Sequence, residues 1–293
     1  MGILTGKKIV ITGSSRGLGR AFAIACAEQG AKIVINGTNS EALNNVQSQI
    51  RANGGLAESL AGSIAEEEVC IELIAKCVKS FGGIDILVNN AGIVRDRTIM
   101  KMTVEEWDEV IAINLRGAFC CTKYAALAMK ENASGGHIIQ IISASGLSGG
   151  FGQGNYAASK AGMMGLLRTS LLELERHNIR SNAMWPVAQT DMTKVVFDRA
   201  EHQAKQAKME APTPEEMGFG KPEEVAAGLV WLASDKAKHL NGQCLSFNGR
   251  KTALWSHPEE HHVSFKNEAW SIEDLDSYYR DKSQFTVYNP RIT

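Results

Sequence analysis

Short apolar runs alternate with helical patterns along the first 250 residues of this 293-residue chain. The runs recur at intervals of roughly 30 residues, and most are apolar throughout, as strands covered on both faces are. This alternation predicts an α/β fold with a doubly wound parallel sheet. The expected strands are Lys7–Thr12, Lys32–Asn36, Ala57–Ala61, Ile84–Asn89, His137–Ser143, Ile179–Trp185 and Gly242–Phe247.

The sequence contains neither an internal repeat nor a linker between residues 1 and 250, so we expect one domain there. Residues 251–293 differ because histidine and aromatic residues replace the strand–helix alternation. We interpret them as a tail that packs on the core or on a neighbouring subunit. The residues that favour packing are Trp255, Phe265, Trp270, Leu275 and Tyr278.

Composition excludes several classes of protein. A formal net charge of −1 gives no electrostatic basis for binding nucleic acid or an anionic membrane. No apolar run is long enough to span a bilayer, and the N-terminus lacks a signal-peptide core. The six cysteines form no Cys-x-x-Cys pair and are typical of free thiols in a reducing compartment. We therefore expect a cytoplasmic protein.

A glycine-rich turn, Gly13–Gly19, follows the first expected strand and precedes a helical pattern over Arg20–Gln29. Glycines let backbone N–H groups approach a pyrophosphate, and a helix N-terminus supplies partial positive charge. The spacing of the glycines differs from the commonest dinucleotide fingerprint, so an ordinary strand–helix turn is the alternative interpretation.

Tyr156 and Lys160 are four residues apart, which places both on one face of a helix. An ammonium group one turn away favours the phenolate and lowers the pKa of the tyrosine from its usual value of about 10. Such a pair can act as a general acid/base. Tyr and Lys at this spacing are more often an amphipathic surface pair, so the catalytic interpretation depends on other motifs.

Those motifs occur in one order along the chain. They are Thr12–Gly19, Asn89-Asn90-Ala91-Gly92, Asn114, Ser143 thirteen residues before Tyr156, Tyr156-Ala-Ala-Ser-Lys160, and Pro186 with Thr190. Together, over about residues 5–250, they resemble a short-chain dehydrogenase/reductase of the classical type. The resemblance implies a Rossmann-like sheet and NAD(P)-dependent hydride transfer between nicotinamide and a carbonyl or secondary alcohol.

The resemblance also implies roles for individual residues. Tyr156 would be the general acid/base and Ser143 would orient the substrate oxygen. Lys160 would lower the pKa of Tyr156 and bind ribose, and Asn114 would hold a proton-relay water. The expected cofactor-binding residues are Gly13, Ser15, Arg16, Gly17, Leu18, Gly19, Thr38, Asn90, Ala91, Gly92, Tyr156, Lys160, Pro186 and Thr190.

Three positions depart from the family pattern. Val187 replaces a glycine after Pro186, Ser63 stands where an aspartate is usual near adenine, and Asn248-Gly249 replaces a terminal Asp-Gly. These departures bear on cofactor affinity more than on the chemistry, since none removes a catalytic group.

The second expected strand ends in Asn36-Gly37-Thr38-Asn39, without the carboxylate that binds the ribose of NAD. Arg16 lies in the glycine turn, where a guanidinium can pair with a 2′-phosphate. We therefore expect NADP(H) rather than NAD(H). In the alternative, Arg16 is a solvated turn residue and Asn36 or Thr38 binds the ribose of NAD.

The substrate is expected to be a small-molecule carbonyl or alcohol, and the apolar residues that follow Trp185 suit a 3-oxoacyl or steroid-like compound. The histidines and glutamates of the tail lack a second ligand group at fixed spacing, so no metal site is expected. The resemblance implies a homotetramer or homodimer. The alternative function is a non-catalytic nucleotide-binding protein that uses the tail as a partner surface.

Overall fold

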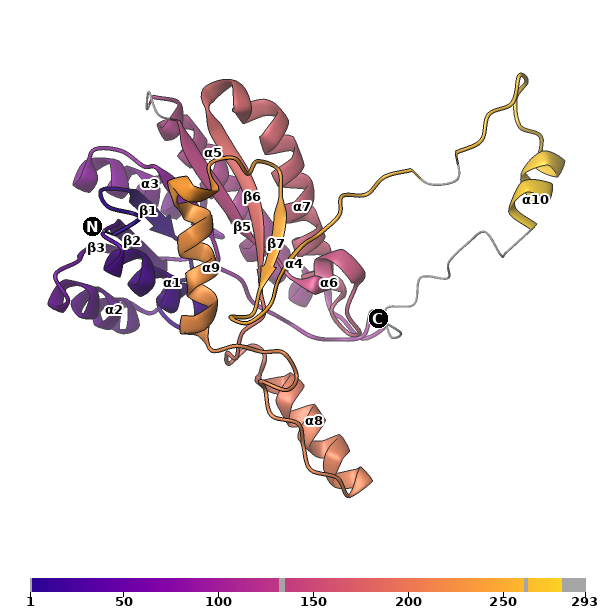
Figure 1. Ribbon diagram of the computed structural model, residues 1–293, viewed down its shortest axis with the longest axis horizontal. Coiled ribbons are helices and arrows are strands. Elements are labelled where there is room, and N and C mark those ends of the chain that lie inside the picture. Colours follow the sequence, from indigo (N-terminus) through magenta and orange to yellow (C-terminus); the bar gives the residue numbers. More distant parts are fainter. Residues whose placement is uncertain (1, 132–134, 261–262, 281–293) are drawn as a thin grey trace. The chain divides into compact units, whose positions relative to one another are not determined.

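The computed structural model describes residues 2–131, 135–260 and 263–280 (Figure 1). It divides the chain into two compact units, Met1–Trp255 and Ser256–Thr293. His261, His262 and Tyr288 of the expected tail lie outside the described residues.

The first unit is built on one eight-stranded sheet with the order β3-β2-β1-β4-β5-β6-β7-β8. Every pairing is parallel except that between β7 and β8, which confirms the expected fold class. The strands are β1 (Lys8–Ile11), β2 (Lys32–Gly37), β3 (Leu56–Ala61), β4 (Ile86–Asn89), β5 (Gly136–Ile141), β6 (Ile179–Pro186), β7 (Cys244–Phe247) and β8 (Thr252–Leu254).

Helices cover both faces of the sheet, and apolar residues of its strands are buried on each face (Figure 1). One core joins the sheet to α1 (Gly17–Glu28), α2 (Ser40–Ala52) and α9 (Pro222–Ala233). The cores on the other face join it to α3 (Glu67–Phe81), α5 (Ala118–Lys130) and α7 (Gly154–Leu174).

Three further helices of the first unit are α4 (Val104–Ile111), α6 (Ala144–Ser148) and α8 (Lys194–Ala207). A capping box formed by Thr103 and Glu106 opens α4. Asn39 caps α2, because the Asn39 side chain accepts the Ala42 N–H at 2.9 Å.

The strand order reverses between β1 and β4. In open α/β sheets a ligand binds in the crevice beyond the carboxyl ends of the strands at such a point. The glycine turn after β1 and the Asn89–Gly92 segment after β4 both reach this crevice.

Strand β8 was not expected from the sequence. It pairs antiparallel with β7 through Phe247 and Thr252, and the Asn248 side chain closes the turn by accepting two backbone N–H groups. Trp255 then packs on Trp185, with ring centroids 5.1 Å apart. The first unit therefore ends at Trp255 rather than at residue 250.

Two truncations test this boundary. Ending the chain after Lys251 removes β8 and Trp255, and should lower the melting temperature by roughly 5–10 °C, since deleting a packed tryptophan costs about 3–5 kcal/mol. Ending it after Trp255 keeps both and should shift the melting temperature by less than about 2 °C. Differential scanning calorimetry measures both values, and equal shifts would contradict the assignment of β8 to the first unit.

The second unit contains one described helix, α10 (Ile272–Arg280). Ser271 caps it by accepting the Asp274 N–H at 3.1 Å, and Lys266 pairs with Asp274. Within this unit, Trp270 packs edge-on against Tyr278 at 5.3 Å. Among the described helices of both units, none is long and apolar enough to cross a membrane.

Candidate active site

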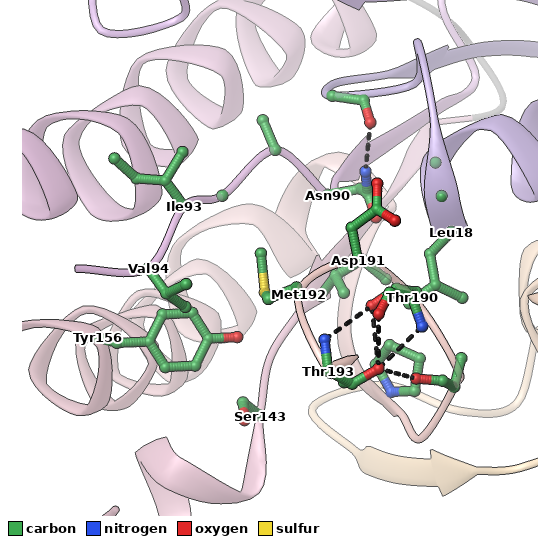
Figure 2. Close-up of a pocket in the computed structure, with 18 of the residues that line it drawn as sticks. Leu18, Asn90, Ile93, Val94, Ser143, Tyr156, Thr190, Asp191, Met192 and Thr193 are labelled. Atoms are coloured by element: carbon green, nitrogen blue, oxygen red, sulfur yellow. Dashed lines mark hydrogen bonds between the residues drawn. The ribbon is translucent and has the colours of Figure 1, made fainter. Parts of the chain in front are cut away.

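A cavity of about 500 Å³ lies at the carboxyl ends of the strands (Figure 2). Its lining includes every residue expected to bind cofactor, together with Ser143, Tyr156 and Lys160. Asn114 lies behind this lining and is fully buried. The structure thus brings together side chains and turns that the sequence spreads over 178 positions, from Gly13 to Thr190.

The glycine turn forms one end of the cavity and packs tightly against the segment after β4. A Cβ atom on Gly13, whose φ is +63°, would fall 2.6 Å from Ala91 Cα. One on Gly19 would fall 2.2 Å from the carbonyl oxygen of Gly13. Asn90 Nδ2 donates to the carbonyls of Thr12 and Gly13 at 2.9 and 3.0 Å, which fixes the turn. Only glycine permits this approach.

Helix α1 begins at Gly17, immediately after this turn. Within the described part of the chain, no side chain caps its N-terminus and no acidic residue occupies its first turn. The first N–H groups of a helix without a capping side chain form a site for an anion. This end of the cavity therefore fits the pyrophosphate of a dinucleotide.

Asn36 and Thr38, the two candidate contacts for the cofactor ribose, lie at the end of β2. Asn36 is buried, and its Nδ2 donates to the carbonyls of Leu60 and Gly62 at 3.1 Å each. Both amide protons are therefore committed to the fold, which argues against Asn36 as a donor to ribose. Thr38 is exposed and lines the cavity.

Arg16 and Asp191 face each other across the cavity, with Nη1 and Oδ2 3.8 Å apart. Both side chains are more than four-fifths exposed, at 82% and 87%. The sequence suggested a phosphate partner for Arg16 but gave no reason to single out Asp191.

The segment after β6 lines the opposite side of the cavity and is held by Thr193. The hydroxyl of Thr193 donates to the carbonyl of Ala188 at 2.9 Å and accepts the Thr190 N–H at 2.8 Å. The Val187 N–H donates to Phe247 O at 2.8 Å, so this departure from the family pattern fits the backbone of β7. Pro186 and Thr190 consequently face the cavity from a fixed turn.

Tyr156 enters the cavity from the first turn of α7, and Ser143 enters from the end of β5 (Figure 2). Ser145 donates its backbone N–H to Ser143 Oγ at 3.3 Å, which leaves the Ser143 hydroxyl proton for another acceptor. Burial raises the pKa of Tyr156, and a hydrogen bond with Ser143 only partly offsets this. Tyr156 therefore keeps its proton at neutral pH.

This direction corrects the expectation that Lys160 lowers the pKa of Tyr156. The Lys160 Nζ atom lies 5.7 Å from the centre of the Tyr156 ring and donates instead to Ile141 O at 2.7 Å. Lys160 is only 3% exposed, and burial lowers its own pKa to about 8. Desolvation by burial is the largest cause of both shifts.

The buried Lys160 has a consequence for stability. Its folded pKa of about 8 lies below the ordinary value of 10.5, so the unfolded chain binds more protons between these values. Raising the pH from 7 to 9.5 should therefore stabilise the wild type by about 2 kcal/mol relative to Lys160→Met. Urea unfolding at both pH values measures this, and a pH-independent difference would contradict a charged, buried Lys160.

Asn114 lies in a π-helical segment, Ala112–Gly117, between α4 and α5. The Asn114 side chain accepts the Ile93 N–H at 2.8 Å and donates to Ile93 O at 3.0 Å. It also contacts Ser159 Oγ at 3.2 Å. Asn114 thus anchors the backbone beside Gly92, where a Cβ would lie 3.7 Å from Lys160 Nζ.

The competing serines are held by other partners. Ser145 donates its hydroxyl to Gln153 Oε1 at 2.6 Å, and Ser148 donates to Ala144 O at 3.1 Å. Gln153 Nε2 in turn lies 3.3 Å from both carboxylate oxygens of Asp96. Sequence reasoning missed Gln153 and Asp96, although both line the cavity close to Tyr156.

Apolar side chains also line the cavity, whose end beside Ser143 and Tyr156 is here called its catalytic half. They are Val94, Trp185, Met192, Val195, Val196 and Phe219. Val195 and Val196 belong to α8, the helix that extends from this side of the first unit (Figure 1). A substrate with an apolar part fits this wall.

Two other expectations concern residues outside the cavity lining. Asn89 is buried, and its Nδ2 contacts Thr122 and Gln140 at 2.9 and 3.1 Å, so its role is structural. Within the described residues, no group of acidic, histidine or cysteine side chains is arranged to hold a metal ion.

Comparisons with known proteins agree with this geometry. Residues 7–201 match the model of the short chain dehydrogenase family. The chain is 37% identical over 245 residues to the 3-oxoacyl-[acyl-carrier-protein] reductase FabG of Staphylococcus epidermidis, covering 83% of this chain and 98% of the relative. It is 38% identical over 252 residues to the 3-oxoacyl-[acyl-carrier-protein] reductase of Synechocystis, covering 85% and 98%.

Solved structures extend the likeness. A short chain dehydrogenase from Mycobacterium avium matches with a TM-score of 0.83 and 31% identity, covering 99% of both chains. A short-chain alcohol dehydrogenase, described as putative, from Sinorhizobium meliloti matches with a TM-score of 0.74 and 31% identity, covering 84% of this chain and 96% of that one. This chain therefore belongs to the short-chain dehydrogenase/reductase family and is an NAD(P)-dependent oxidoreductase.

Proposed function

We propose that this protein is an NADPH-dependent carbonyl reductase that acts on 3-oxoacyl compounds, with Tyr156 as the general acid. The observation that carries the proposal is the meeting of Ser143, Tyr156 and Lys160 in one cavity with the glycine turn. The 3-oxoacyl class is supported by the names of the two curated relatives and by the apolar wall beside Tyr156. A steroid-like ketone fits the same wall and is the second substrate class.

The proton is supplied by the protein. When bound, the nicotinamide cofactor supplies the hydride, so negative charge develops on the carbonyl oxygen. Ser143 donates a hydrogen bond to this oxygen, and Tyr156 donates its proton to it. The raised pKa of Tyr156 favours this direction, because it keeps the phenol protonated before the reaction.

Lys160 and Asn114 support the proton transfer from Tyr156 without contacting the substrate oxygen. Lys160, with its pKa near 8, binds ribose hydroxyls and restores the proton of Tyr156. Asn114 holds the backbone at Ile93 and positions a water that links Lys160 to solvent. We place the pyrophosphate at Gly13–Gly19 and the carboxamide of nicotinamide at Pro186 and Thr190.

The preference for NADPH rests on the glycine turn and the end of β2. A cation, Arg16, lines the cavity from the turn, and a hydroxyl, Thr38, lines it from the end of β2. Neither position carries the carboxylate that binds the ribose of NAD. Charge-assisted hydrogen bonds to a 2′-phosphate are roughly twice as strong as neutral ones.

We further infer a cytoplasmic homodimer or homotetramer. All six cysteines lie among the described residues, and each is buried and free, as in a reducing compartment. Large apolar side chains exposed on α4 and α5 favour self-association. They are Val104, Trp107, Phe119 and Leu127.

A substrate panel tests the proposed function. NADPH and NADH oxidation should be followed with 3-oxoacyl thioesters, steroid ketones and simple ketones. We expect the highest kcat/KM with NADPH and a 3-oxoacyl thioester. Higher kcat/KM with steroid ketones would replace the substrate class, and binding of NADPH without turnover of any ketone would favour the non-catalytic alternative.

A further inference from the structure

The cofactor end of the cavity contains an anion as well as a cation. Of the described residues that line the cavity, four carry charged side chains: Arg16, Asp96, Lys160 and Asp191. Asp96 and Lys160 lie beside Tyr156 in the catalytic half. Arg16 is therefore matched at its own end by Asp191 alone, at 3.8 Å.

The position of Asp191 is set by its backbone. Thr190 and Thr193 bond each other through the Thr190 N–H and the Thr193 hydroxyl at 2.8 Å, and the Thr193 N–H donates to Thr190 O at 3.0 Å. Asp191 lies between them, inside this turn. Close to Asp191, a Cβ on Gly17 would lie 4.0 Å from Thr190 Cγ2. Asp191 thus lies beside Arg16 and Thr190 beside Gly17. Figure 2 shows Asp191 and Thr190 next to each other in the cavity lining.

From this arrangement we propose that Asp191 is a specificity-determining residue, which competes with the 2′-phosphate of the cofactor for the Arg16 guanidinium. In the free enzyme its carboxylate takes the place of the phosphate. When NADPH binds, Arg16 exchanges Asp191 for the phosphate, and the displaced carboxylate remains close enough to repel it. NADH carries no phosphate at this position, so its binding leaves the pair intact. This inference rests on the proposed use of NADPH.

The exposure of the Arg16 and Asp191 side chains sets the expected size of the effect on cofactor binding. Both side chains are largely exposed, so the pair contributes little in absolute terms and is screened by salt. Asp191→Asn keeps the shape and removes the charge. It should tighten NADPH binding by roughly 3- to 5-fold at low ionic strength, the range of an exposed ion pair, and change NADH binding by less than about 1.5-fold.

The test is a double-mutant cycle read by binding. Fluorescence titration gives Kd for NADPH and NADH, and calorimetry gives Kd for 2′,5′-ADP and 5′-AMP, which isolate the phosphate. The proteins are wild type, Asp191→Asn, Arg16→Ala and the double variant. Asp198→Asn, an exposed carboxylate outside the cavity lining, is the matched control for charge.

We expect Asp191→Asn to favour NADPH and 2′,5′-ADP selectively, with a smaller gain in the Arg16→Ala background and in about 1 M salt, where the Debye length is about 3 Å. Equal gains for both cofactors, equal gains with and without Arg16, or an equal gain from Asp198→Asn would overturn the proposal. A wild type without NADPH preference would instead refute the cofactor assignment. A wild-type preference that Asp191→Asn leaves unchanged would refute only the role of Asp191.

Discussion

Replacing Tyr156 by phenylalanine is expected to lower kcat for carbonyl reduction by about 10²- to 10⁴-fold, the range that a general acid contributes. The change removes one hydroxyl and keeps the ring, which is 9% exposed and packed at the start of α7. Because the hydroxyl acts where negative charge develops in the transition state, Kd for NADPH should stay within about 2-fold of the wild type.

The control for this variant is Tyr124→Phe on α5. Tyr124 bonds Glu67 at the surface, and its hydroxyl lies outside the cavity lining. Its loss should leave kcat unchanged. Steady-state kinetics with a 3-oxoacyl thioester measures both variants, and Tyr156 is not the acid if Tyr156→Phe keeps more than a few per cent of wild-type kcat.

Arg16→Ala is expected to lower kcat/KM with NADPH by about 10- to 100-fold, since a hydrogen bond to a charged group contributes about 1.5–3 kcal/mol. With NADH the value should change by less than about 3-fold, because the neutral ribose makes no charge-assisted bond to this side chain. The NADPH preference of the wild type should therefore disappear in the variant.

Arg20→Ala provides the matched arginine. Arg20 lies one turn further along α1, where it donates to Gln49 Oε1 at 2.8 Å outside the cavity lining. Its loss should preserve the preference for NADPH. The assignment of Arg16 fails if the wild type prefers NADH, or if the preference survives in Arg16→Ala.

The fold could be predicted largely from sequence, because buried parallel strands are apolar throughout and the glycine turn marks the first crossover. All seven expected strands form, with ends that differ by at most two residues from the expected ones. Strand β8 could not be predicted. Its three residues, Thr252–Leu254, are too few to show the hydrophobic pattern of a strand. Their pairing with β7 depends on the turn that Asn248 closes.

Less of the site could be predicted than of the fold. The motifs gave the residues that line the cavity, since each motif follows the carboxyl end of a strand. The motifs did not give the electrostatics of the site. The pKa of Tyr156 is raised mainly by burial in the folded chain, which the spacing of Tyr156 and Lys160 in the sequence does not reveal. Asp191 and Gln153 were missed for another reason. Their partners, Arg16 and Asp96, are distant from them in the sequence.

The π-helical turn at Asn114 is a further example. Its residues, Ala112–Gly117, fit an ordinary helix as well. What the wider turn does is visible only in three dimensions, where the Asn114 amide binds both backbone groups of Ile93. π-helical turns of this kind occur often at functional sites.

The central claim is that the Ser143–Tyr156–Lys160 cavity reduces a carbonyl carbon with hydride from NADPH. The most direct test is to incubate the wild type and Tyr156→Phe with 3-oxoacyl thioesters and NADPH deuterated on either face of nicotinamide C4, and to analyse the products by mass spectrometry. We predict a 3-hydroxyacyl product that carries one deuterium at C3 from one of the two cofactor faces, formed by Tyr156→Phe at least about 10²-fold more slowly than by the wild type. A wild type that binds NADPH but transfers no deuterium, or a Tyr156→Phe variant that transfers it as fast as the wild type, would contradict the claim.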